Sequence, residues 1–199
     1  MILDIKYNTQ VDNSSGKYGG GAIVDGNSQC GYAMAAHVAQ PIFPDAAKDS
    51  WIAEYLNNLE NGEMGKRVRA QISWYKGARL GAAINGHSLA LQDMIAGAGL
   101  QSKYEVIQPK ASGSLDEIKK AIDGGSPVGC CAWVTPSGHF ETIIGYEGDT
   151  LIMHDSYGNF YPSWNPQSYG KGAAVHYPAD WLKAKMGNNW AYYYYWKKK

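Results

Sequence analysis

The chain has 199 residues, enough for one domain that buries about 70% of the surface its unfolded form would expose. Its 18 basic side chains balance 18 acidic ones, so net charge indicates no nucleic-acid or anionic-membrane partner, although Lys197, Lys198 and Lys199 make the end locally basic. Three cysteines leave one unpaired, no window approaches the roughly 18 apolar residues of a spanning helix, and no signal-peptide pattern is present. We therefore expect a single domain over residues 1–199, soluble, without a membrane segment or disulfide framework, and made in a reducing compartment.

The first half of the chain predicts mainly helices. Residues 2–7 form a short apolar run that indicates a strand, and a glycine-rich loop follows over 14–28. The segment from Cys30 to Gln40 is rich in alanine, lacks strand alternation and stops at Pro41, so it predicts a short buried helix beginning at Cys30. Three more helices are expected, over 49–61 with Asp49 or Ser50 as the cap, over 64–80 and over 88–97.

The second half predicts an antiparallel sheet. After a strand over 103–107, Ser114 and Glu117 form a capping box and Gly124 with Gly125 supplies a stop, which defines a helix between them. Short apolar or aromatic runs separated by turn residues then predict a meander; they cover 127–134, 139–147, 150–155 and 189–196. The predicted fold class is α+β, with a helical lobe over 1–100 packed on a sheet lobe over 101–199.

Cys30 is the best candidate nucleophile among the cysteines. It follows a polar loop and begins a helix, where unpaired amides and the helix dipole stabilise a thiolate. Cys130 and Cys131 lie within a valine- and alanine-bearing strand, where apolar surroundings raise a thiol pKa. We expect these two to be ordinary core residues.

A thiol nucleophile needs a base, and five histidines are available. His37 lies seven residues after Cys30, and a rise of about 1.5 Å per residue places it roughly 10 Å along the helix axis, too far for direct proton transfer. His87 and His176 lie in or near predicted loops with no carboxylate or amide partner in view. His139 and His154 remain, both in the predicted hairpin.

The hairpin register selects His139. A three-residue turn over 147–149 would place Asp155 opposite Glu141, which makes it the diagonal neighbour of His139 at roughly 7 Å between backbones. A carboxylate at that place fixes the tautomer and orientation of the ring. His154 would point to the other face, and a two-residue turn would change the register.

A metal site finds little support in the sequence. His139 and Glu141 form the H-x-E of zinc deaminases, but no P-C-x-x-C follows them. Neither H-E-x-x-H, a zinc-finger spacing nor a phosphate-binding G-x-x-x-x-G-K-[ST] occurs. We expect no metal and no organic cofactor.

Thiol, imidazole and carboxylate thus occur in the order Cys30, His139, Asp155, within the segments "YNTQVDN", "QCGYAMAAHV", "PSGHFETIIGY" and "LIMHDSYGN". This set resembles papain-like cysteine peptidases, most closely the bacteriocin-leader (double-glycine) peptidase-like branch, over residues 7–159. The resemblance implies a helical lobe that carries the nucleophile helix and packs on an antiparallel sheet. It also implies Cys30 as nucleophile, His139 as acid and base, and Asp155 as the orienting acid.

The family also uses a glutamine shortly before the cysteine to donate to the oxyanion. Gln10 occupies the matching "YNTQ" context, although 20 positions separate it from Cys30, with the glycine-rich loop as the insertion. Gln29 is adjacent to Cys30, where its side chain would diverge from the site. We therefore prefer Gln10, with the backbone amide of Cys30 as the second donor.

The predicted activity is hydrolysis of peptide or amide bonds. The tyrosine-rich composition, the basic end and the lack of a spanning segment favour a phage endolysin that cuts peptidoglycan stem peptides, and that collects in the host cytoplasm before it reaches the cell wall. Two alternatives stay open. One is a bacterial processing peptidase or effector; the other is a non-catalytic peptide- or glycan-binding module that uses aromatic rings such as Trp164, Trp190 and Tyr192 to Tyr195.

Overall fold

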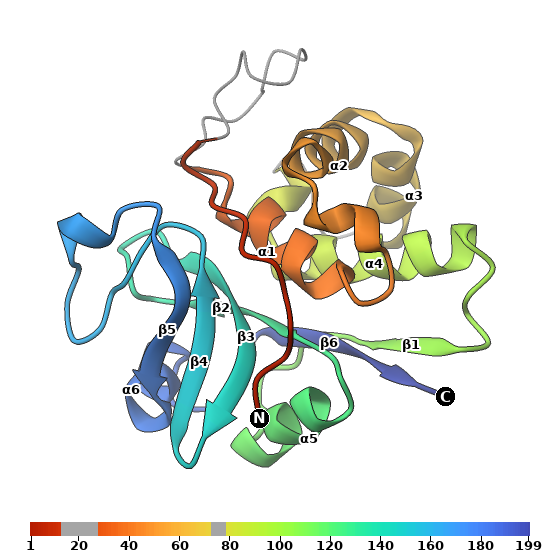
Figure 1. Ribbon diagram of the computed structural model, residues 1–199. Coiled ribbons are helices and arrows are strands. Elements are labelled where there is room, and N and C mark those ends of the chain that lie inside the picture. Colours follow the sequence, from red (N-terminus) through yellow and green to blue (C-terminus); the bar gives the residue numbers. More distant parts are fainter. Residues whose placement is uncertain (13–27, 73–78) are drawn as a thin grey trace.

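The computed structural model describes residues 1–12, 28–72 and 79–199 (Figure 1). Helices from the first half of the chain lie against one face of a six-stranded sheet, and two short helices cover its other face. The prediction of an α+β fold is confirmed. The glycine-rich loop predicted over 14–28 falls almost wholly outside the described residues. Among the described helices, none combines the length and apolar character that crossing a bilayer demands.

The helical lobe contains α1 (Cys30–Ala39), α2 (Asp49–Asn61), α3 (Glu63–Gln71) and α4 (Ile84–Gly97), with 3-10 turns at Pro44–Ala47 and Leu80–Ala82. Helix α1 begins at Cys30, as predicted, and ends before Pro41, which has no N–H to continue it. All residues of α1 after Cys30 are buried, because small alanine side chains let α2, α4 and the sheet approach it closely.

Several boundaries in this lobe differ from the prediction. The predicted strand over 2–7 is wrong, because Ile2 forms a single bridge to Gly145 and Leu3 N donates to the Ile144 carbonyl, but no ladder continues from there, and Lys6 N donates to the Gln40 side chain instead. Helix α2 is preceded by Lys48, without a side-chain cap from Asp49 or Ser50. Helix α3 ends at residue 71 and not 80, and α4 begins four residues before the predicted 88.

The sheet has the order β1-β6-β2-β3-β4-β5, and every pairing is antiparallel. Its strands are β1 (Tyr104–Ile107), β2 (Val128–Ala132), β3 (His139–Glu147), β4 (Thr150–Asp155), β5 (Gly172–Pro178) and β6 (Tyr193–Lys198). The simple meander is therefore wrong in one respect, since β6 returns to lie between β1 and β2. The prediction also missed β5 and the helix α6 (Ala179–Lys185) that follows it.

The β3–β4 hairpin corrects the predicted turn and still reaches the predicted register. Glu147 pairs with Thr150, so the turn has two residues and not three. A bulge between Ile143 and Gly145 then shifts the pairing by one position, and Thr142 lies opposite His154. Continued by one residue, this register sets Glu141 opposite Asp155, which is the arrangement that brings Asp155 beside His139.

Helices pack on both faces of the sheet. One face packs against α5 (Leu115–Asp123) and α6 through residues such as Ile118, Ile143 and Leu182. The other packs against α1 and α4 through residues such as Met34 and Tyr194. Helix α5 begins where Ser114 Oγ accepts a hydrogen bond from Glu117 N at 3.0 Å, which confirms the predicted cap, although the Glu117 carboxylate bonds elsewhere.

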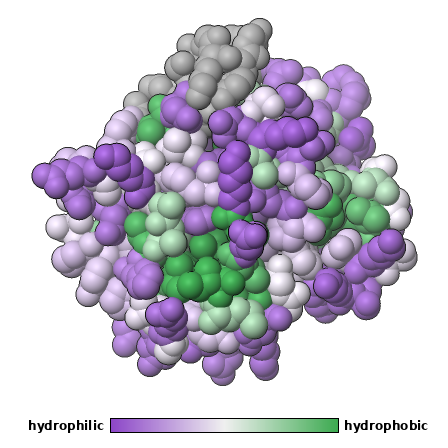
Figure 2. All heavy atoms as spheres, in the orientation of Figure 1, coloured by the Kyte–Doolittle hydropathy of each residue, from purple (hydrophilic) through white to green (hydrophobic). Residues whose placement is uncertain are grey.

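The aromatic run at 190–196 is mostly core. Trp190, Tyr193, Tyr194 and Trp196 are buried, with alternate rings of β6 on opposite faces of the sheet, and Tyr192 is the exposed member at 53%. The binding surface that the sequence suggested there is therefore largely unavailable for contact. The face drawn in Figure 2 is mostly hydrophilic, with an apolar patch near the N-terminus, where Met1 and Ile2 are exposed.

Candidate active site

Cys30 lies at the first position of α1, partly exposed, on the wall of a surface cavity of about 520 Å³. The side chain of His139 and the backbone N–H groups of Phe140 and Gly31 favour the anionic form of its thiol. Burial raises the pKa of this thiol, but the hydrogen bond and charge of His139, with the two N–H groups, outweigh burial and lower it. The site thus favours a thiolate.

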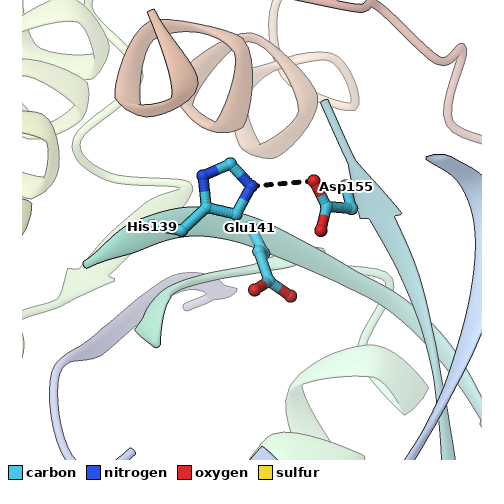
Figure 3. Close-up of side chains that lie close together, drawn as sticks. All are labelled: His139, Glu141 and Asp155. Carbon is cyan, nitrogen blue, oxygen red and sulfur yellow. Dashed lines mark hydrogen bonds and ion pairs between the residues drawn. The ribbon is translucent and has the colours of Figure 1, made fainter. Parts of the chain in front are cut away.

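His139 begins β3 and connects Cys30 to Asp155. Its Nε2 lies 2.7 Å from Asp155 Oδ1, and the other ring nitrogen is on the opposite side of the ring (Figure 3). Burial lowers the pKa of the imidazole, but the charge of Asp155 and hydrogen bonds to Asp155 and Cys30 hold it well above its usual value. The lowered pKa of Cys30 and the raised pKa of His139 both favour the charged forms of the two side chains.

Asp155 ends β4 and is fully buried, so its charge needs donors on both oxygens. Oδ1 accepts hydrogen bonds from His139 and from the backbone N–H groups of Tyr157 at 3.0 Å and Gly158 at 3.2 Å. Oδ2 accepts one from the Tyr177 hydroxyl at 2.9 Å. These donors fix the direction of the carboxylate toward His139.

Glu141 lies beside His139 and Asp155, but the surroundings of its carboxyl group differ from those of Asp155. Both of its carboxyl oxygens are buried and have no hydrogen-bond partner within the described part of the chain. Burial raises the pKa of Glu141 well above its usual value, and the charge of Asp155 adds to this effect. Burial therefore favours the neutral, protonated form of Glu141.

Among the described residues, one cluster could offer ligands to a metal ion, because its ligand atoms all lie within 4.8 Å of one another. It consists of His139, Glu141 and Asp155 (Figure 3). Asp155, however, already accepts four hydrogen bonds, and two come from backbone groups that cannot move aside independently. A cation would have to replace these donors. We assign no metal to the cluster.

Gln10 is held by Ser156, and its predicted role depends on this neighbour. The Ser156 hydroxyl donates to Gln10 Oε1 at 2.7 Å, and Gln10 N donates to the Ser156 carbonyl at 3.1 Å. Since Ser156 follows Asp155 directly, Gln10 is anchored at the end of β4, close to the predicted site. Its amide oxygen is committed to Ser156, which turns the amide nitrogen away from that hydroxyl.

The remaining histidines have structural partners. His37 is buried, with Nδ1 3.2 Å from the Thr142 hydroxyl, and His154 Nε2 lies 2.8 Å from the carbonyl of Ile5, on the face away from His139. His87 lies inside α4 and not in a loop, with Nδ1 3.0 Å from the Tyr55 hydroxyl. His176 is exposed on β5. None of these four lines the cavity among its described residues.

The two other cysteines behave as the sequence indicated. Burial raises the pKa of Cys130 well above its usual value, and burial together with the nearby Cys30 raises the pKa of Cys131 to about 11. Both therefore remain thiols at neutral pH, whereas the pKa of Cys30 is shifted in the opposite direction.

The cavity has a feature that sequence reasoning missed. An aromatic cluster of Tyr157, Phe160 and Trp164 lines it beside His139, and only Trp164 was singled out, for a different reason. The signal was the density of aromatic residues directly after Asp155, in "SYGNFYPSW". The full lining is Ser28, Cys30, Gly81, Ala82, Thr135, Ser137, Gly138, His139, Phe140, Tyr157, Phe160 and Trp164.

Comparison with known proteins gives one finding. The model of the family described as Peptidase_C39 like matches residues 2–188, which is nearly the whole chain and includes every predicted site residue. No curated protein and no solved structure matches the sequence.

Proposed function

The chain belongs to the Peptidase_C39 like family, a branch of the papain-like cysteine peptidases, and on that basis we propose that Cys30, His139 and Asp155 act together as its catalytic residues. One observation supports this most strongly. Cys30 and His139 line the same cavity, which is large enough for a peptide segment, His139 lowers the pKa of the Cys30 thiol, and His139 Nε2 lies 2.7 Å from Asp155.

In the proposed reaction the Cys30 thiolate attacks the carbonyl carbon of the scissile amide. The C–N bond of the tetrahedral intermediate then breaks, and the imidazolium of His139 gives its proton to the departing amine. A water molecule enters, His139 takes one of its protons, and the hydroxide attacks the thioester. Collapse of this second intermediate releases the acid and returns the thiolate and the imidazolium.

Asp155 does not exchange a proton in this scheme. Its bond to Nε2 keeps a hydrogen on that nitrogen and turns Nδ1 toward Cys30, and its charge stabilises the imidazolium. The hydrogen bonds from Tyr157, Gly158 and Tyr177 prevent the carboxylate from turning elsewhere.

The oxyanion of each intermediate needs donors near the attacked carbonyl. We assign the backbone N–H of Cys30, at the start of α1, and the side chain of Gln10 to this role. The anchoring of Gln10 to Ser156 supports the assignment, because it fixes the glutamine next to the strand end that carries Asp155.

For the substrate we propose the stem peptides of bacterial peptidoglycan, with the protein acting as a phage endolysin that is held in the host cytoplasm until the membrane is breached. Two features support this. The cavity combines small residues, Gly81 and Ala82, with aromatic rings such as Trp164, and so has room for a branched peptide. The exposed C-terminal lysines would be attracted to the anionic polymers of a cell wall.

The test is an overlay of purified protein on a gel that contains bacterial cell wall, with Cys30→Ser and Cys131→Ser as a matched pair of thiol variants. We expect clearing by the parent and by Cys131→Ser, and none by Cys30→Ser. Mass spectrometry of the released fragments then identifies the bond. Cleavage of peptides without clearing of the wall would favour a processing peptidase, and retention on the wall without clearing would favour a binding module.

A further inference from the structure

The aromatic cluster formed by Tyr157, Phe160 and Trp164 is in direct contact with the His139 ring. The centroid of Phe160 lies 5.4 Å from that of His139, and the centroid of Tyr157 lies 6.2 Å from it. Trp164 packs on both, at 4.7 Å from Phe160 and 5.2 Å from Tyr157. The rings therefore form one continuous apolar wall on the histidine side of the cavity.

The loop that carries this wall is held in one conformation by its own hydrogen bonds. Asn159 N donates to Ser168 Oγ at 2.7 Å, and Asn165 N donates to the Asn159 carbonyl at 3.0 Å, which closes a small hairpin. Gly158, with φ of 154°, leaves room for the indole, since a Cβ there would lie 2.9 Å from Trp164. A wall fixed in this way can select a substrate without first becoming ordered.

The chemistry decides which half of a substrate meets the wall. His139 must deliver its proton to the departing amine, so the amine side of the scissile bond lies toward His139. The acyl half stays with Cys30, on the part of the lining that the helical lobe contributes, which includes Ser28, Gly81 and Ala82. The rings that touch His139 are thus placed to meet the first residue of the leaving half.

We propose that the aromatic cluster is a specificity site that binds an apolar side chain on the residue directly after the scissile bond. This inference rests on the proposed function, because it needs Cys30 and His139 as the reacting pair. An aliphatic or aromatic side chain at this position is buried against three rings, so such a residue binds better than glycine or a charged residue. In a stem peptide the same wall would receive an alanine methyl or the methylene stem of a diamino acid.

The experiment digests a library of random peptides with blocked N-termini and sequences the pooled new N-termini, so that the first cycle reports the residue after the cut. We expect leucine, isoleucine, phenylalanine and methionine to be enriched about tenfold over glycine and aspartate. Trp164→Ala is expected to reduce that enrichment at least threefold. Tyr192→Asn, which removes an exposed ring elsewhere and tolerates the positive φ of 60°, is expected to leave it unchanged.

The outcomes separate this inference from the proposed function. If the first sequencing cycle of the parent's digest shows no preferred amino acid, the inference is overturned whether or not the variants fold. Enrichment of glycine or acidic residues in that cycle would also overturn it. Clearing of cell wall without cleavage of the library would overturn the inference alone. Equal cleavage by the parent and by Cys30→Ser would remove the proposed function as well. So would the failure of the parent to cleave either the cell wall or the library.

Discussion

Asn8 donates its backbone N–H to Nε2 of His37 at 3.0 Å, and this bond holds the N-terminal segment against α1. Because Nε2 is the acceptor, His37 must be neutral, with its proton on Nδ1 toward Thr142. The ring of His154 lies 5.1 Å away and is likewise an acceptor, from Ala174 N at 3.1 Å. Two neutral imidazoles therefore fasten the segment that leads to Gln10.

This arrangement predicts that acid weakens the fold. Burial lowers the pKa of His37 well below its usual value, with His154 adding to the effect, and burial lowers the pKa of His154 also. Unfolding lets both rings take up protons, so the stability they contribute is complete above about pH 6.5 and is lost below it, by up to about 1.4 kcal/mol per pH unit for each ring. His37→Gln should reduce this pH dependence by about one proton in urea unfolding between about pH 7.5 and 5.

The control for this prediction is His176→Gln, which changes an exposed histidine on β5. It should leave the pH dependence as it is in the parent. An equal loss of stability in acid for the parent and for His37→Gln would contradict the assignment of His37 as a neutral acceptor.

Removal of the Asp155 charge should reduce activity without unfolding the protein. In Asp155→Asn the amide oxygen can still accept from His139 and the backbone, and the amide nitrogen can donate to Tyr177. The imidazolium loses its counter-charge, so we expect kcat/KM to fall by about two to four orders of magnitude. Asp149→Asn, at a carboxylate 92% exposed in the hairpin turn, is the matched control and should retain full activity.

The carboxyl group of Glu141 should destabilise the folded protein above neutral pH. Its raised pKa means that the folded state binds a proton that the unfolded state releases near pH 4.3, so stability falls as pH rises from there toward the folded pKa. Glu141→Gln resembles the neutral acid. We expect it to match the parent near pH 4.5 and to exceed it by about 1 to 3 kcal/mol near pH 8 in chemical unfolding.

The exposed Glu147→Gln serves as the comparison for Glu141, and should show no such divergence with pH. If Glu141→Gln were less stable than the parent at both pH values, the carboxyl group would have a partner that this account does not give it.

Helix α1 should tolerate no side chain at Gly31, next to Cys30. A Cβ there would lie 2.4 Å from His87 Nε2 and 2.7 Å from the Gly81 carbonyl, both buried. We expect Gly31→Ala to destabilise the fold by about 1 to 3 kcal/mol and to lower activity, because α1 must shift and move Cys30. Gly97→Ala, where a Cβ has open space, should be neutral or stabilising by up to about 1 kcal/mol in thermal unfolding.

Local sequence patterns predicted the elements that carry the proposed catalytic residues. The alanine-rich run before Pro41 predicted α1 and its start at Cys30, and Ser114 predicted the start of α5. The sequence analysis also predicted that His139 and Asp155 are neighbours, but it assumed a hairpin turn that is one residue too long. The bulge at Ile143 to Gly145 restored the register, and the sequence analysis did not predict it, although a glycine within a strand often marks a bulge.

Long-range pairing explains what the sequence did not show. The insertion of β6 between β1 and β2 depends on contacts between distant segments, which local periodicity does not encode. The segment over 2–7 has strand composition, yet the backbone of its residues Ile5 and Lys6 bonds to the side chains of His154 and Gln40. Strand β5 was missed because it follows a loop of aromatic and turn residues and opens with "GAA", which has little strand character.

The central claim is that His139, oriented by Asp155, turns Cys30 into a thiolate at neutral pH. The most direct measurement is the rate of Cys30 alkylation by iodoacetamide against pH, followed by mass spectrometry of the Cys30 peptide in the parent and in His139→Ala. We predict that Cys30 of the parent reacts rapidly well below the ordinary thiol pKa of about 8.5, and that His139→Ala moves the midpoint up to that value or above it. The same midpoint in both proteins would contradict the account.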